Sequence, residues 1–423
     1  MPRPDDAPGT RMTEPFRIRD FRLLWTGMSA SLLGDGVFLV ALAWQVYELS
    51  NKASALSLVG VAMSVPHVAL LLIGGVLSDR FPRRRVMVVA DLLRGLAIGT
   101  LGVLSITGGL RMGHVLVLVA VYGAGMALFG PAFDAIVPDI VPSGLLAQAN
   151  ALDLFVRPAA LRLAGPALGG WLIAAAGPGG AFLLDAATFA VSMGCLLALR
   201  PPASPQAGEG SVLRQILEGF RYVRAHVWLW GTFLAATVAY LLFMGPTEVL
   251  LPFLVKNDLA GGAGELGLVF AFGGVGALGA ALLVGHRGMP RRSMVVMYAC
   301  WAAATFTVAA YGLAGRLWQV MAASLVFNAL ETAGTVIWAT TKHRLIPAAL
   351  LGRVSSLDWF ISLGLLPLSF ALTGIAAGVF GARGTLVGAG LLGGTATIAF
   401  LFLPGMRAIE WAGEHRSPVP GGG

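Results

Sequence analysis

Residues 75–87 read GVLSDRFPRRRVM. This stretch places one acid and four arginines between two apolar segments that are each long enough to cross a bilayer. Because exposed charge is costly in hydrocarbon, a compact charged turn between two spans must lie at the water interface. The pattern therefore predicts a multi-pass membrane protein with a short, rigid cytoplasmic turn at this point.

The composition of the whole chain agrees with a membrane protein. Of its 423 residues, 57% are hydrophobic and 12% are charged, whereas about a quarter of the residues in a soluble domain are charged. Apolar runs of roughly 20 residues recur along the chain, and we count twelve. The predicted spans are approximately residues 22–48, 55–77, 86–107, 114–137, 156–176, 181–199, 227–254, 265–285, 294–314, 317–341, 358–379 and 385–403.

The basic residues indicate the topology. Most of the 29 Lys and Arg residues lie in the termini and in alternate loops, close to span ends. This is the distribution that the positive-inside rule describes, so both termini are expected in the cytoplasm. The net charge of +8 is therefore read as a topology signal, and we expect the partner to be a lipid bilayer and not nucleic acid.

The chain divides into two similar halves. An N-terminal arm (1–21) precedes six spans (22–199), a linker with an amphipathic interfacial helix (200–226), six more spans (227–403) and a tail (404–423). At an offset near 205, Leu24-Trp25 matches Leu229-Trp230, and LLAQANALDLF (145–155) matches LLGRVSSLDWF (350–360). Because six is an even number, the two repeats are parallel and both start on the same side of the membrane.

These features resemble the major facilitator superfamily, in particular the drug:proton antiporter branch that includes macrolide and enterobactin exporters. The charged turn is similar to the family pattern G-x-L-a-D-r-x-G-r-[RK], with Pro82 in place of its second glycine. The matching residues are Gly75, Leu77, Asp79, Arg80, Arg83 and Arg84. The resemblance implies an all-α fold of twelve transmembrane helices in two parallel repeats, in a bacterial cytoplasmic (inner) membrane.

The resemblance also implies a gating role for the charged turn. In the family, the acid of this turn braces it against neighbouring span ends, and Asp79 would do so here. Asp134 and Asp139 lie at the cytoplasmic end of the fourth span, within reach of Arg80, Arg83 or Arg84. We expect a small ion-pair lock, and the alternative is that these charges only set the topology.

The fifth span carries a glycine and proline cluster. Gly165-Pro166 and Gly169-Gly170 are similar to the G-P-x-x-G-G core of a motif associated with antiporters, although Leu161 replaces an expected glycine. Such a cluster permits close helix contact and a bend. The alternative reading is ordinary membrane packing.

Three acids are expected deep inside spans. Asp35 lies 13 residues beyond Arg22, which at a rise of about 1.5 Å per residue places it roughly 20 Å into the first span. Glu248 and Glu331 lie within the seventh and tenth spans. A charge at the bilayer centre costs about 3 kcal/mol, so each acid needs a reason to be there.

The family resemblance gives these acids a common setting. Spans one, four, seven and ten line the central cavity in the superfamily, and Asp35, Glu248 and Glu331 fall on three of them. We expect no acid at comparable depth in the third, ninth or twelfth span. Burial favours the protonated form of a carboxylate, and an arriving cation would displace that proton. The alternative is a structural acid that is hydrogen-bonded to a neighbouring helix.

Other ionisable residues are expected to have smaller roles. Asp153 and Arg157 are four apart and should form a structural ion pair, whereas Arg162 is a candidate for the cavity, where it would bind an anionic group or hold Asp35 or Glu331.

Two further acids are expected outside the functional site. Asp91 and Arg94 should pair with each other without a transport role, and Asp185 should cap the outer end of the sixth span.

The sequence contains no phosphate-binding G-x-x-x-x-G-K-[ST] loop and no cluster with metal-ligand spacing. It predicts a monomer that is not an enzyme, with no cofactor and no metal. The favoured function is proton-coupled export of amphiphilic small molecules such as drugs, macrolides or siderophores. The alternatives are a lipid or lysolipid flippase, and a membrane sensor or scaffold without transport activity.

Overall fold

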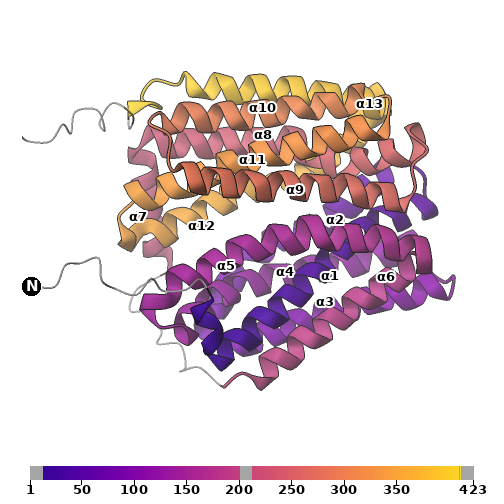
Figure 1. Ribbon diagram of the computed structural model, residues 1–423, viewed down its shortest axis with the longest axis horizontal. Helices are drawn as coiled ribbons and strands as arrows, with labels where there is room; N and C mark the ends of the chain where they lie inside the picture. The colour runs from indigo at the N-terminus through magenta and orange to yellow at the C-terminus, as the bar shows by residue number, and fades with distance from the viewer. Residues whose placement is uncertain (1–12, 201–211, 409, 411–423) are drawn as a thin grey trace, which may run out of the picture. The chain divides into compact units, whose positions relative to one another are not determined.

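The computed structural model describes residues 13–200, 212–408 and 410, and their regular structure is helical throughout (Figure 1). The α-helices are α1 (Arg19–Leu49), α2 (Ala53–Arg80), α3 (Arg83–Ile106), α4 (Met112–Ile140), α5 (Leu146–Pro158), α6 (Gly165–Ala198), α7 (Val212–Ala225), α8 (Val227–Phe253), α9 (Ala263–Arg287), α10 (Ser293–Leu313), α11 (Leu317–Leu345), α12 (Ala348–Gly364) and α13 (Leu366–Leu401). Short 3₁₀ turns lie at Glu14–Arg17 and Ser143–Leu145, and π-helical turns lie at Ala159–Ala164 and Leu254–Asp258.

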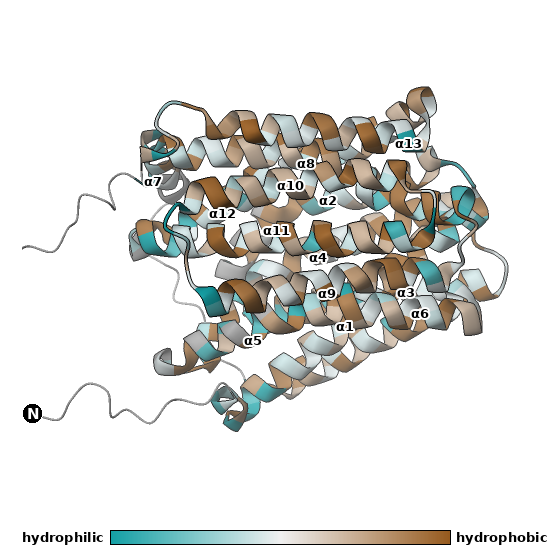
Figure 2. Ribbon diagram, turned by 45° about the horizontal axis from the view of Figure 1, so that its top comes forward, coloured by the Kyte–Doolittle hydropathy of each residue, from teal (hydrophilic) through white to brown (hydrophobic). Residues whose placement is uncertain are grey.

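The surfaces of these helices are suited to lipid. Large apolar side chains remain exposed along them, including Leu96 at 61%, Ile375 at 65% and Val379 at 71%. The helix bodies are mostly white or brown in Figure 2, and much of the teal lies at helix ends and in connections. Such apolar surface is stable only when hydrocarbon covers it.

The charged turn is shorter than the sequence indicated. α2 continues to Arg80 and α3 begins at Arg83, so only Phe81 and Pro82 connect them. Pro82 has no backbone N–H to donate and occupies the N-cap of α3, with φ −54° and ψ 116°. The charged residues on either side are therefore held on helical turns.

Ten helical stretches in the described chain are long and apolar enough to cross a membrane. Two of them cover 51 and 52 residues, which is enough for two crossings each. Both break at a glycine with positive φ: Gly177 (φ 72°, ψ 172°) and Gly381 (φ 71°, ψ 170°). Residues other than glycine rarely adopt this conformation. Dividing each stretch at its glycine would give twelve spans, so the predicted number is compatible with the ten stretches found.

The described chain separates into two compact units, Met1–Ser50 with Ala62–Ala207 and Asn51–Val61 with Gly208–Gly423. In the first unit, α6 packs on α1 and α3, and α3 packs on α4. In the second unit, α13 packs on α8 and α10, and α10 packs on α11. Equivalent helices therefore form equivalent pairs, as expected for a parallel repeat.

The start of α2 belongs to the second unit, which the division of the sequence into halves did not predict. The amide of Asn51 donates a 2.5 Å hydrogen bond to the side-chain oxygen of Asn257. A Cβ added at Gly374 would lie 3.0 Å from Ser57. These contacts join residues more than 200 positions apart in the sequence, so no local pattern indicates them.

The predicted interfacial helix is α7. Val223 is buried in the core of the second unit, whereas Leu217 and Phe220 are half exposed. Glu218 forms a 2.5 Å ion pair with Arg353 of α12. The side chains of Leu213 and Ile216, which complete the predicted apolar face, lie outside the described residues.

The two glycine breaks give a first prediction. Gly381→Ala should lower the free energy of unfolding by about 1–3 kcal/mol, because alanine is strained at this φ and ψ. Gly378→Ala, three residues earlier in α13 with open space around the added Cβ, is the matched control. Thermal unfolding of the purified protein in detergent would measure both. Equal melting temperatures for the two variants would refute the assignment of strain to Gly381.

Candidate functional site

A cluster of ionisable side chains lies inside the first unit, at the junction of α1, α3, α4 and α6. Asp35 of α1 accepts a 2.6 Å hydrogen bond from the hydroxyl of Tyr122 on α4. The guanidinium of Arg94 on α3 lies 3.7 Å from the other oxygen of Asp35. Asp35 is thus held between a neutral donor and a cation, and its side chain is 14% exposed.

Arg94 is fixed more tightly than Asp35. It forms a 2.5 Å ion pair with Asp91, whose second oxygen accepts a 2.7 Å hydrogen bond from Ser192 of α6. The guanidinium also lies over the rings of Phe129 and Phe189, at 4.6 and 4.5 Å from their centroids. Two aromatic faces and one close carboxylate therefore hold this cation in place.

A third carboxyl group completes the cluster. Asp185 of α6 is fully buried, and its Oδ2 has no hydrogen-bond partner. Its Oδ1 lies 3.3 Å from the hydroxyl of Thr188. Gly34 precedes Asp35 in the chain, and a Cβ added at Gly34 would overlap the side chains of Asp185 and Thr188. Asp35 and Asp91 thus share the guanidinium of Arg94, and Asp185 lies beside Gly34, the chain neighbour of Asp35.

Part of this cluster differs from what the sequence predicts. The expected pair of Asp91 with Arg94 is present, and Arg94 also lies 3.7 Å from Asp35, a contact that the sequence did not predict. Asp185 is a buried residue of the cluster and not an interfacial cap. Its spacing could have indicated this, because Asp185, Thr188 and Ser192 recur at i, i+3 and i+7 on one face of an apolar helix.

The glycines beside Asp35 bring α1 and α6 together. A Cβ added at Gly36 would lie 2.8 Å from the Cα of Gly165 and about as close to backbone carbonyl oxygens of the π-helical turn. A Cβ added at Gly169 would lie 3.0 Å from Val37. Pro166 and Gly170 are buried in the same stretch. The glycine and proline cluster therefore serves close helix packing here, and its link to antiport stays a prediction.

The other predicted coupling residues are found in the following surroundings. Arg162 is in the π-helical turn Ala159–Ala164 of the first unit. The cation that pairs with Asp35 is Arg94 of α3. Glu331 of α11 accepts a 3.1 Å hydrogen bond from Thr335, and Glu248 of α8 is exposed. Both glutamates belong to the second unit. Their part in coupling stays a prediction.

At the charged turn, Arg83 pairs with Asp139 of α4 and donates a 2.9 Å hydrogen bond to the carbonyl of Ala135. Arg84 donates a 2.8 Å hydrogen bond to the carbonyl of Leu199, and Arg80 is exposed. The surroundings of Gly75 and of the Asp79 side chain lie outside what the structure describes. One ion pair of the expected lock is thus present, and its gating role stays a prediction.

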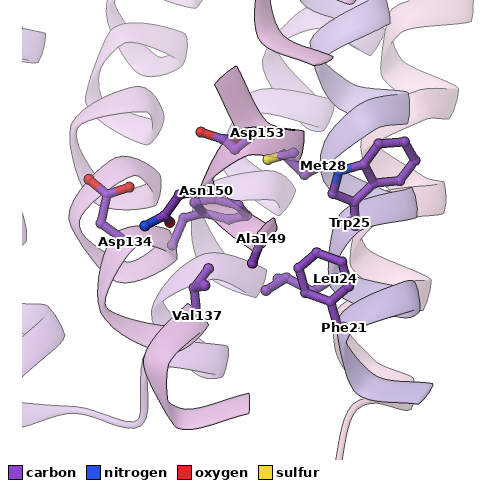
Figure 3. Close-up of a pocket in the computed structure, with 10 residues that line it drawn as sticks. Phe21, Leu24, Trp25, Met28, Asp134, Val137, Ala149, Asn150 and Asp153 are labelled. Carbon is purple, nitrogen blue, oxygen red and sulfur yellow. The ribbon is translucent and has the colours of Figure 1, made fainter. Parts of the chain in front are cut away.

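Asp134 was expected in that lock, but it lines a pocket of about 200 Å³ between α1, α4 and α5. Figure 3 shows this pocket, with Asp134 on α4, Asp153 on α5 and Trp25 on α1. Asp153 Oδ2 lies 2.7 Å from Nε of Arg157, the expected structural pair.

The contact between α1 and α6 gives a second prediction. Gly36→Ala should destabilise the protein by about 1–3 kcal/mol, since the new methyl group would meet the backbone of α6 and its π-helical turn. Gly194→Ala on α6 has open space around its added Cβ and should be neutral or slightly stabilising. Thermal unfolding would compare them. A Gly36→Ala protein as stable as the control would contradict the close helix contact.

Comparison with known proteins agrees with this architecture. The sequence model of the family described as "Transmembrane secretion effector" matches residues 10–420. The multidrug efflux pump Tap of Mycolicibacterium fortuitum is 28% identical over 415 residues, covering 93% of this chain and 97% of that protein. The enterobactin exporter EntS of Shigella boydii serotype 18 is 28% identical over 357 residues, covering 80% of each.

Solved structures share the fold. A bacterial homologue of the human lysosomal transporter Spinster, in an inward-facing and unoccupied conformation, has a TM-score of 0.67 at 16% identity and covers 95% of this chain and 99% of that one. The nucleoside transporter NupG has a TM-score of 0.65 at 10% identity, with 89% and 98% covered. The predicted fold class is confirmed, and this chain belongs to the transmembrane secretion effector family of major facilitator superfamily transporters.

Proposed function

We propose that this protein is a proton-coupled exporter of amphiphilic small molecules that works as an antiporter by alternating access. Family membership and the relatives named as an efflux pump and as a siderophore exporter support the direction of transport and the class of substrate. We place the protein in a bacterial inner membrane as a monomer with both termini in the cytoplasm. The charged turn that carries Asp79 is the proposed cytoplasmic gate.

The main support for proton coupling is that carboxyl groups of the buried cluster share one cation. Two buried carboxyl groups, those of Asp35 and Asp91, are within ion-pair distance of the one guanidinium of Arg94. An unpaired ionised carboxylate is very costly in a medium of low dielectric constant, so a buried carboxyl group without a counter-ion holds its proton. Asp185, which has an oxygen without any partner, supports the presence of at least one such proton.

Asp35 is the acid best suited to exchange a proton during transport. Its contact with Arg94 is 3.7 Å, whereas Asp91 lies 2.5 Å from the same guanidinium. Asp91 therefore neutralises Arg94 even when Asp35 is protonated. The hydroxyl of Tyr122 donates to Asp35 and stabilises its ionised form. A cationic substrate that favours the ionised form would release the proton, and such competition for one carboxylate produces exchange. Glu331, Glu248 and Arg162 are proposed as further participants.

Asp35→Asn should abolish accumulation driven by a proton gradient, at least tenfold below wild type, because asparagine cannot release a proton. The measurement is uptake of ethidium, a lipophilic cation, into proteoliposomes with an imposed pH gradient. Asp20→Asn, at the start of α1, is the control and should transport normally. Full proton-driven uptake by Asp35→Asn would refute the coupling role. Movement of a fluorescent lysolipid without movement of ethidium would support the flippase alternative.

The two neighbouring acids should differ in their response to neutralisation. Asp185→Asn should change stability by less than about 1 kcal/mol, because asparagine resembles a protonated aspartic acid in size and shape. Asp91→Asn removes the close counter-ion of a buried guanidinium and should cost about 3–5 kcal/mol. Unfolding of both variants in detergent at neutral pH tests this contrast. A loss of stability from Asp185→Asn that matches the loss from Asp91→Asn would show that Asp185 is ionised.

A further inference from the structure

The pocket between α1, α4 and α5 has features of a cation site. It encloses about 200 Å³, and two carboxylates, Asp134 and Asp153, are among its ten lining residues, none of which is basic. Asp153 Oδ1 is buried without a hydrogen-bond partner, and Arg157 pairs with its Oδ2.

The second unit contains residues equivalent to those that line this pocket. The hydrogen bonds at the ends of α4 and α11 show which residues are equivalent. The amide of Val141 donates to the carbonyl of Val137 at the end of α4, at 3.0 Å. The amide of Ile346 donates to the carbonyl of Lys342 at the end of α11, also at 3.0 Å. Val137 and Lys342 therefore occupy equivalent positions. The same offset of about 205 residues relates Asp153 to Asp358 within the matched LLAQANALDLF and LLGRVSSLDWF segments.

In the second unit an ammonium group binds the equivalent carboxylate. Nζ of Lys342 lies 2.5 Å from Oδ2 of Asp358 and 5.2 Å from the ring centroid of Trp338. Nε1 of Trp338 donates a 2.9 Å hydrogen bond to the same oxygen, and the hydroxyl of Ser362 lies 3.3 Å from Oδ1. Both carboxylate oxygens of Asp358 are therefore satisfied, and its charge is neutralised.

The first unit differs from its repeat in ways that open and charge the pocket. Val137 replaces Lys342, which removes the ammonium, and the smaller Phe133 replaces Trp338. Asp134 stands where the second unit has an alanine, which adds a carboxylate. The pocket in the first unit thus keeps the carboxylate and an aromatic wall, gains a second acid, and has no lysine among its lining residues. Arg157, at the position of Ser362, pairs with Asp153 Oδ2 and lies 5.5 Å from the centroid of the Phe133 ring, which leaves Asp153 Oδ1 and Asp134 for a ligand.

We propose that this pocket binds a small organic cation with a primary ammonium group, which takes the place that the Lys342 side chain occupies in the second unit. The ammonium would contact Asp153 Oδ1 and Asp134, and its alkyl part would lie against Phe133 and Trp25. The volume is below the 300–1,000 Å³ of typical ligand pockets, so the site suits a short alkylammonium compound or the head of a longer one. Asp35 is not among the lining residues of this pocket, and the proposal does not depend on proton coupling.

The test uses n-butylammonium chloride as the probe and the full-length protein in detergent. Wild-type protein should show a saturable rise in melting temperature relative to sodium chloride at the same ionic strength, because a ligand that binds only the folded state stabilises it. Butan-1-ol, which lacks the charge, should not reproduce this rise. A rise of equal size with butan-1-ol, or no saturable rise at all, would overturn the proposal.

Val137→Lys tests the comparison between repeats directly. The introduced lysine should reach Asp153, raise the melting temperature without ligand and abolish the further rise with n-butylammonium. Val137→Met, of similar length but uncharged, should not raise the melting temperature without ligand. An equal response of wild type and Val137→Lys to n-butylammonium would refute the site.

Asp134→Asn decides the question if Val137→Lys does not fold, because Asp134 is exposed on α4 and its loss should leave the fold intact. Half-saturation by n-butylammonium should then require a concentration about three- to fivefold higher, which corresponds to the loss of one partly solvated ion contact. An unchanged half-saturation would overturn the proposal. Asp35→Asn should keep the full thermal response, so a failure of proton coupling and a failure of this site are distinguishable.

Discussion

The cost of burying charge in hydrocarbon governs the polar residues within the helices of this protein. In the second unit the buried Asp358 is matched by one lysine, and the pair is complete. In the first unit acids exceed their available cations, both around Arg94 and in the pocket beside Asp153. A complete pair stabilises structure and needs no external partner. The carboxyl groups in excess of the cations are those to which we assign the exchanged proton and the cationic ligand.

The internal repeat makes this contrast informative. The two units share their helix pairs, their glycine breaks and the hydrogen bonds at the ends of α4 and α11. Against this common scaffold, differences in charge stand out at individual positions. Val137 and Lys342 lie at the same place in equivalent helices, yet only one carries an ammonium. The same helix arrangement thus carries a balanced ion pair in the second unit and an excess of acids in the first.

Much of the fold could be predicted from the sequence because the membrane imposes long apolar runs and interfacial charges. The helices on both sides of Pro82, the repeat and the Asp153–Arg157 pair follow from local patterns. The composition of the charge cluster could be predicted only in part. Asp35 was identified by its depth, but which residues surround it depends on how closely α1, α3 and α6 approach one another. Asp185 packs against Gly34, the chain neighbour of Asp35, because glycine leaves room for it, and that contact joins residues about 150 positions apart.

The break at Gly177 has a practical consequence. Because helical structure continues on both sides of this glycine and Pro178 follows it directly, the two arms of α6 are joined with almost no loop. A protease needs an extended segment of several residues, and an inserted epitope needs a flexible site that tolerates extra chain. This connection offers neither, so accessibility labelling on its side of the membrane would depend on other connections, such as Thr107–Arg111 between α3 and α4.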